Sequence, residues 1–273
     1  MTAVIDTHSH LYAHEFDHDR EAVLARAREA GVEAIITLGE DLPTSERCLE
    51  LAETHEHVFA AAGYHPHNAK DADEAGLAYL KRLAKHPRVV AVGEIGLDFY
   101  RNHSPRHVQV DVFRRQLETA ASVAKPVAVH CREAHDAMLA IAESWSEALG
   151  GRLPDGRPLG VMHYFDGDPA LAERYVRLGF LISVHTSVTH PNKRTLHEVA
   201  SHLPLEVLVV ETDAPYGAPQ AHRGKRNEPA YATEAIARIA ELCGITFDEA
   251  AERTSENARR LFGLPVPAAG GVA

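Results

Sequence analysis

Short runs of β-branched and other apolar residues alternate along this chain with segments in which apolar residues recur at helical spacing. The apolar runs predict eight strands, at residues 3–6, 33–38, 58–62, 89–93, 127–129, 160–162, 180–184 and 207–211. Helical spacing follows several of them, as at Val23, Ala27 and Ala30. Eight strands that each lead into a helix are typical of a closed parallel barrel, so we predict an α/β fold with a single (β/α)8 TIM barrel.

A doubly wound sheet is the main alternative to this barrel. It usually has fewer strands and a Gly-rich phosphate loop, and the chain contains neither a G-x-G-x-x-G nor a Walker motif. Segment 150–158, rich in Gly and Pro, separates the fifth helix from the sixth strand, and we interpret it as a long loop away from the chemistry. Residues 1–263 are therefore predicted to form the barrel, and residues 264–273 a flexible tail.

Composition narrows the class of protein further. The 273 residues are 45% hydrophobic, enough for a large core, and no segment has the pattern of a signal peptide or a membrane span, so we expect a cytoplasmic protein without membrane contact. The net charge of −11 argues against a broadly basic surface that coats nucleic acid. The three scattered cysteines, Cys48, Cys131 and Cys243, argue against a disulfide framework and a zinc ribbon.

The active site of such a barrel lies at the C-terminal ends of its strands, and these ends are unusually polar. The first strand leads into His8-Ser9-His10, whose two imidazoles project in the same direction because strand side chains alternate. Such a pair can hold one metal ion. The later strand ends supply further potential ligands, namely His65, Glu94, His130, His163 and Asp213.

Each of these residues also has a purely structural interpretation. His130 and His163 could be hydrogen-bonded core residues, Glu94 could pair with Arg101, and Asp213 could cap the loop that follows it. Taken together, acids and imidazoles packed without a metal would leave buried polar groups poorly satisfied. The mixed set suits Zn²⁺, Mn²⁺, Fe²⁺ or Co²⁺, with Mg²⁺ possible, and its size predicts two ions bridged by a carboxylate.

In order along the chain, from residue 4 to about residue 262, the motifs resemble those of the TatD-type metal-dependent deoxyribonucleases of the amidohydrolase superfamily. The matching segments are 8–10, Gly63-Tyr64-His65-Pro66-His67, Gly93-Glu94-Ile95-Gly96-Leu97-Asp98, His130-Cys131-Arg132, residues 211–216 and residues 222–229. A generic amidohydrolase would lack the Glu94 motif and the block at 222–229. The resemblance implies a (β/α)8 barrel that hydrolyses phosphodiester bonds of DNA, often as a 3′–5′ exonuclease.

The resemblance also implies a role for each matching residue. Two divalent ions (Mg, Mn or Zn) would be held by His8, His10, Glu94, His130, His163 and Asp213. Of these, Glu94 would bridge the ions and Asp213 would act as the catalytic general base. The substrate phosphate would be contacted by His65, Arg132, His222, Arg223 and Lys225, with Arg226 adding local attraction. The expected partner is DNA, single-stranded or at 3′ ends, with no obligate protein partner.

The chain departs from the family pattern at two places. Cys131 replaces a residue that is more often a small hydroxyl residue, and the segment 164–167 differs from the usual sequence, which bears on substrate preference. Two other functions remain open at this point. One is a hydrolase of lactones, amides or phosphotriesters, which a carbamylated lysine in place of Glu94 would favour; the other is a non-catalytic metal-binding protein.

Overall fold

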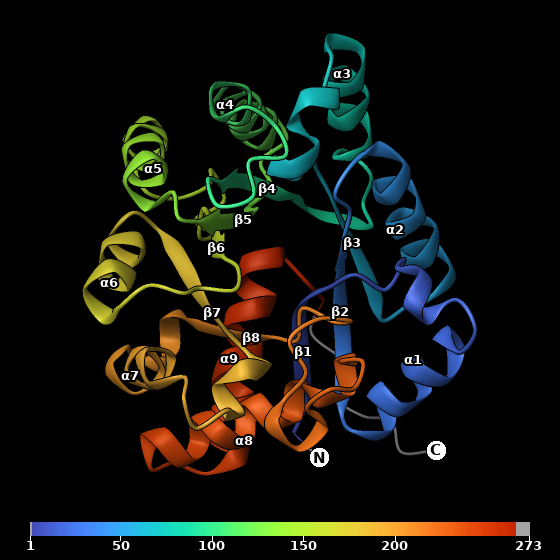
Figure 1. Ribbon diagram of the computed structural model, residues 1–273, viewed down its shortest axis with the longest axis vertical. Helices are drawn as coiled ribbons and strands as arrows, with labels where there is room; N and C mark the ends of the chain where they lie inside the picture. Colours follow the sequence, from blue (N-terminus) through green and yellow to red (C-terminus); the bar gives the residue numbers. More distant parts are fainter. Residues whose placement is uncertain (1, 266–273) are drawn as a thin grey trace.

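The computed structural model describes residues 2–265. Its strands form one parallel sheet in the order of the chain, at the centre of a ring of helices (Figure 1). The predicted (β/α)8 barrel is thereby confirmed. The strands are β1 (Val4–Ser9), β2 (Val32–Leu38), β3 (Val58–Ala62), β4 (Val89–Asp98), β5 (Val127–Arg132), β6 (Gly160–Met162), β7 (Phe180–His185) and β8 (Leu208–Glu211).

The helices follow the strands in turn, and one more helix follows the last of these. The bounds are α1 (Arg20–Glu29), α2 (Leu42–Thr54), α3 (Glu74–Leu83), α4 (Arg106–Ser122), α5 (His135–Leu149), α6 (Pro169–Arg177), α7 (Arg194–His202), α8 (Ala232–Cys243) and α9 (Phe247–Phe262). No helix between residues 2 and 265 is long and apolar enough to cross a membrane. Of the predicted tail, residues 266–273 lie outside the described residues.

Several strands extend further than the apolar pattern predicted. The prediction ended the fourth strand at residue 93, but β4 continues to Asp98 because its backbone pairs with β5, Gly96 opposite His130 and Asp98 opposite Arg132. Gly96 permits this close pairing, since its φ is +145° and a Cβ atom there would lie 1.9 Å from the carbonyl oxygen of His130. Glu94 and His130 therefore lie within strands, not after them.

The C-terminal helix closes one end of the barrel. Small and branched side chains fill the barrel interior, and they pack against Ala258, Leu261 and Phe262 of α9. The loop at 150–158 lies at this same end, as predicted, because Arg157 donates a hydrogen bond of 2.8 Å to the carbonyl oxygen of Ala124, ahead of β5. The candidate active site therefore lies at the opposite end of the barrel, where the strands terminate.

The barrel closes between β8 and β1 through a buried carboxyl group. Oδ1 of Asp6 accepts a hydrogen bond of 2.9 Å from the backbone N–H of Thr212, and Oδ2 lies 2.7 Å from the Thr212 hydroxyl. Next to this contact, the N–H of Asp213 donates to the carbonyl of His8 at 2.9 Å. Closure therefore places the start of the chain beside the end of β8.

Replacing the Asp6 carboxyl tests this closure. Asp6→Ala removes the acceptor of the buried Thr212 N–H and leaves the Thr212 hydroxyl only a long contact of 3.5 Å to the carbonyl of His8. We expect it to lower the free energy of unfolding by about 2–4 kcal/mol. Asp6→Asn keeps an acceptor and a donor in the same space. It should lower the free energy of unfolding by less than about half as much as Asp6→Ala does. Chemical denaturation in excess chelator measures both, with exposed Ser201→Ala as a control near zero. Equal losses in Ala and Asn variants would contradict this account.

Candidate metal centre

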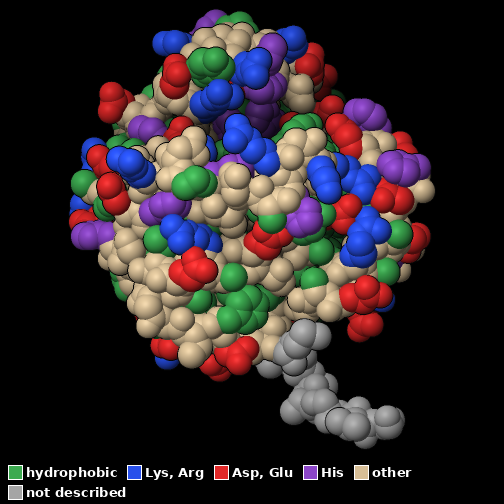
Figure 2. Space-filling view, turned by 60° about the horizontal axis from the view of Figure 1, so that its bottom comes forward, with side chains coloured by type: hydrophobic (Ala, Val, Ile, Leu, Met, Phe, Trp, Pro, Cys, Tyr) green, Lys and Arg blue, Asp and Glu red, His purple; other side chains and the backbone are tan. Residues whose placement is uncertain are grey.

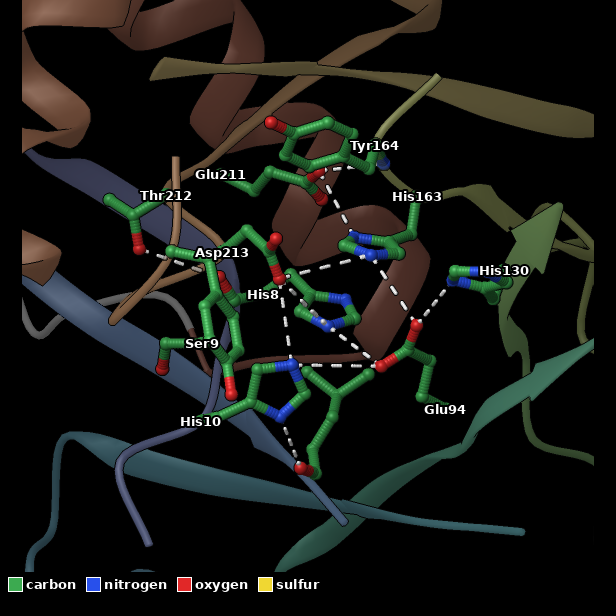
Figure 3. A network of polar contacts seen from close by, with 12 residues as sticks. His8, Ser9, His10, Glu94, His130, His163, Tyr164, Glu211, Thr212 and Asp213 are labelled. Carbon is green, nitrogen blue, oxygen red and sulfur yellow. Dashed lines mark hydrogen bonds and ion pairs between the residues drawn. The ribbon is translucent and has the colours of Figure 1, made fainter. Parts of the chain in front are cut away.

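One oxygen of the Glu94 carboxylate faces the imidazole pair from β1 (Figure 3). The Glu94 side chain is buried, and its Oε2 lies 3.3 Å from Nε2 of His8 and 3.6 Å from Nε2 of His10. Oδ1 of Asp213 lies 3.8 Å and 3.5 Å from the same two nitrogens. His8, His10 and Asp213 thus offer three ligand atoms within 4.8 Å of one another, close enough to share one ion.

The other oxygen of Glu94 faces a second group of imidazoles. Its Oε1 lies 3.0 Å from Nδ1 of His130 and 3.4 Å from Nε2 of His163. Nε2 of His65 is 3.5 Å from the same oxygen, and His65, Glu94 and His130 form a further cluster of potential ligands. Sequence reasoning placed His65 against the substrate, whereas its nitrogen lies as near to Glu94 as those of the expected ligands do.

A carboxylate that sequence reasoning did not assign orients His163. Oε1 of buried Glu211 lies 3.1 Å from Nδ1 of His163 and accepts a hydrogen bond of 2.7 Å from the N–H of Tyr164. Nδ1 of His163 therefore faces Glu211, while Nε2 faces Glu94. The period-two spacing of Glu211 and Asp213 on one strand end could have indicated this role.

Asp98 plays a similar part on the other side of the centre. Its Oδ2 lies 3.4 Å from Nε2 of His130 and 2.9 Å from Nε2 of His67. Its Oδ1 accepts hydrogen bonds from the backbone N–H groups of Tyr100 and Arg101, at 3.0 Å and 2.7 Å. Asp98 thereby holds both His130 and the start of the loop that follows β4.

Burial and the neighbouring charges shift the pKa values of the centre's carboxyl and imidazole groups in different directions. Burial raises the pKa of a carboxyl group, but the imidazoles around Glu94 hold its pKa well below the ordinary value. Burial and His163 lower the pKa of His8 to about 3, so its imidazole is neutral at pH 7. Burial opposes a charge on His10 as well, but its pKa rises to about 10 because it faces the carboxylates of Asp213 and Glu94.

These residues fit a divalent metal ion. Nε2 of His8 is buried and has no hydrogen-bond partner, although it points towards two carboxylate oxygens. A neutral imidazole and an ionised carboxylate are the protonation states that metal ligation requires. Nitrogen and oxygen donors of this mixture suit Zn²⁺ and Mn²⁺, and the carboxylates admit Mg²⁺.

The structural interpretations of Glu94 and Asp213 are not supported by these contacts. Among residues 2–265 no ion pair joins Glu94 to Arg101, whose backbone bonds to Asp98 instead. The Asp213 side chain points to His8 and His10, and the turn after it is closed by the Asp213 carbonyl, which accepts from the N–H of Tyr216 at 2.8 Å. Asp213 has a φ of +60°, a conformation that Asp and Asn tolerate better than most residues.

The expected substrate contacts fall into two groups. Arg132 lies at the mouth of the barrel, with its guanidinium carbon 4.0 Å from the centre of the Tyr100 ring. Arg223 and Lys193 line a groove of about 620 Å³ beside Tyr164. In Figure 2, histidine side chains gather in a hollow with Lys and Arg side chains next to it, and Lys225 is also exposed. These cations are free to meet an anion.

His222 and Arg226 are held by other parts of the protein. The ring of His222 stacks on Tyr231 with 3.9 Å between the ring centres, and its Nε2 lies 3.1 Å from Oε1 of Glu234. Arg226 pairs with Asp19 at 2.7 Å and with Glu228 at 2.9 Å. The expectation that Arg226 attracts substrate is wrong, because these two carboxylates neutralise its charge and fix the loop to α1.

Cys131 and Asp166, which belong to the two segments that depart from the family pattern, both contact His135 outside the barrel. Sγ of Cys131 lies 3.3 Å from Nδ1 of His135, and Nε2 of His135 lies 3.0 Å from Asp166. Burial raises the pKa of the Cys131 thiol to about 12, so the thiol stays protonated and unreactive. Cys131 and Asp166 therefore link α5 to the loop after β6, and they contribute no ligand to the centre.

Comparison with known proteins places these features in a family. The chain matches the family described as TatD related DNase over residues 5–263. The metal-dependent hydrolase YabD of Bacillus subtilis (strain 168) is 40% identical, over 95% of this chain and 98% of the relative. The 3′-5′ ssDNA/RNA exonuclease TatD of Erwinia amylovora is 36% identical, over 96% of this chain and all of the relative.

A solved structure agrees with both the sequence and the fold. The crystal structure of YJJV, a TatD homologue from Escherichia coli, superposes with a TM-score of 0.88 at 34% identity, over 96% of this chain and 98% of the other. The sequence-based prediction of a metal-dependent hydrolase on a TIM barrel is thereby confirmed. This chain belongs to the family of TatD-related deoxyribonucleases.

Proposed function

We propose that this protein is an exonuclease that uses two divalent metal ions to hydrolyse phosphodiester bonds of single-stranded DNA from its 3′ end. The observation that carries the proposal is the buried Glu94 carboxylate, with Oε2 facing His8 and His10 and Oε1 facing His65, His130 and His163. Relatives named 3′-5′ ssDNA/RNA exonuclease support the substrate class and the polarity. A cytoplasmic location, with no membrane component and no obligate protein partner, is part of the same proposal.

Two groups of residues would hold the ions. His8, His10 and Asp213 would hold the first. His130 and His163, which both face Oε1 of Glu94, would hold the second, and His163 also lies in one cluster with His8 and Glu94. His65 is close enough to join the second group. The ions would be Mg, Mn or Zn; when bound, they lower the pKa of a water molecule and offset the charge of the phosphoryl group.

Side chains of the protein would carry out proton transfer and bind the substrate. Asp213 lies at the edge of the centre, where its carboxylate can accept a proton from the attacking water and release it towards the leaving oxygen. Arg132 and Arg223 would bind the substrate phosphates through their guanidinium groups, with Lys225 and His222 nearby in sequence. Buried Glu211 keeps His163 in its orientation throughout the reaction.

Degradation of end-labelled DNA tests the proposed activity directly. We expect the purified protein to shorten a single strand from its 3′ end, to act more slowly on a blunt duplex, and to stop when a chelator is added. Activity that returns with added Mg²⁺, Mn²⁺ or Zn²⁺ would identify the working ion. Hydrolysis of a lactone or a phosphotriester without any action on DNA would instead support another amidohydrolase function.

Replacing Glu94 tests whether it bridges two ions. The unstripped protein should contain up to two divalent ions per chain, and Glu94→Ala should reduce the occupancy of both, because each group of imidazoles loses a carboxylate oxygen. Elemental analysis measures this, and Arg223→Ala, which removes a charge but no proposed ligand, should leave the metal content near normal. Full metal content in Glu94→Ala would show that Glu94 does not bridge.

Asp213→Asn separates the proton-transfer role from folding. Asn keeps an oxygen near the imidazoles and tolerates the positive φ, but it cannot accept the proton. The variant should fold, retain at least one ion, and lose activity by a factor on the order of 10² or more. Turnover of an oligonucleotide and thermal unfolding of both proteins are compared. If the variant turned over substrate as fast as the unaltered protein, Asp213 would not be the group that accepts the proton.

A further inference from the structure

Large apolar side chains are rarely exposed in this protein, and the exceptions are informative. Among residues 2–265 the exposed ones are Tyr100, Tyr216 and Phe247, at 51%, 56% and 37% of their surface. Phe247 begins α9, near the closed end of the barrel. Both tyrosines lie at the opposite end, two residues after β4 and five residues after β8. The two most exposed of these rings thus lie at the mouth of the metal centre.

The two tyrosines stand on opposite sides of that mouth. The strands follow one another around the barrel in chain order, so β4 and β8 lie across from each other. Tyr216 lies next to the first group of ligands, with its ring centre 6.1 Å from that of His10. Tyr100 lies next to the second group, because Asp98 holds its backbone and contacts His130. A phosphate at the centre would have one ring on either side.

The backbone of each tyrosine is fixed, although its ring is exposed. The N–H of Tyr216 donates to the carbonyl of Asp213, and its own carbonyl accepts a hydrogen bond of 2.6 Å from Nδ2 of buried Asn227. Arg132 lies over the Tyr100 ring, where the guanidinium and the ring attract each other. Rings anchored in this way can contact a ligand with little loss of conformational entropy.

Positive charges without carboxylate partners accompany the rings. Within the described part of the chain, no ion pair involves Arg132, Lys193 or Arg223, whereas Arg226 farther along the same loop is paired with Asp19. The cations lie beside Tyr100 and in the groove next to Tyr164. Exposed aromatic rings combined with unpaired cations match a ligand that has flat rings joined by phosphates.

We propose that Tyr100 and Tyr216 are base-stacking platforms, which hold the nucleobases on either side of the scissile phosphate. This inference rests on the proposed nuclease function and adds the part of the substrate that is recognised. Stacking on a tyrosine ring requires a base whose face is free, and in a duplex that face is covered by the neighbouring base pair. The rings therefore select unpaired strands and tolerate any base sequence.

The test compares two oligonucleotides with the same phosphates. One is a deoxythymidine oligonucleotide, and the other carries abasic tetrahydrofuran residues on both sides of the bond that is cleaved. Tyr100→Ala and Tyr216→Ala should each raise KM for the first by a factor on the order of ten, and change KM for the second less than about twofold. Tyr100→Phe and Tyr216→Phe should restore normal KM values, because phenylalanine also stacks.

Phe247→Ala is the matched control, since it removes an exposed aromatic ring far from the mouth and should change neither KM. Fluorescence anisotropy of both oligonucleotides with the Asp213→Asn variant, alone and combined with each Tyr→Ala change, gives the same comparison without turnover. Equal losses on both oligonucleotides, or no loss on either, would overturn the stacking role. A protein that cleaves no nucleic acid at all would overturn the proposed function itself.

Discussion

The buried Glu94 carboxylate is the constraint around which this barrel is arranged. It is only 2% exposed, and a carboxylate removed from water is unstable unless opposite charge compensates it. Among residues 2–265, five imidazoles and no lysine or arginine lie within 3.6 Å of its oxygens. Imidazoles can compensate the negative charge in two ways. They can take up protons and become positive, or they can bind metal cations that supply the positive charge. The centre is therefore built from groups that exchange protons for metal ions.

This arrangement depends on where the barrel closes. His8 and His10 lie at the end of the first strand and Asp213 follows the last, so these three candidate ligands are close only because the segment after β8 bonds to the end of β1. The Asp6 carboxyl makes that junction through Thr212, one residue before Asp213. Fold closure and site assembly are thus the same event at this edge. A barrel that opened here would lose the first group of ligands but keep the second.

The fold could be predicted from the sequence because it follows from strand periodicity, and the same periodicity brought out the candidate ligands that the structure places together. Eight apolar runs gave the barrel, and polar residues at their ends gave the centre. Strand lengths could not be predicted, because backbone pairing continues past the apolar run wherever a neighbour such as His130 is available. Glu211 was missed because its role depends on its proximity to His163, from a strand two places away in the sheet. The ion pairs of Arg226 and the proximity of His65 to Glu94 could not be foreseen for the same reason: their partners lie on distant segments.

An acidic protein can still attract an anionic polymer at this site. The net charge of −11 is spread over the surface, where salt screens charges beyond about 8 Å at physiological ionic strength. The divalent ions we propose would offset the carboxylates of the centre, and Arg132 and Arg223 at the mouth would add positive charge. Within residues 2–265, Arg132 and Arg223 at this mouth take part in no ion pair, so their charge is available to a phosphate chain. The exposed tyrosine rings then distinguish a nucleic acid strand from any other chain of phosphates.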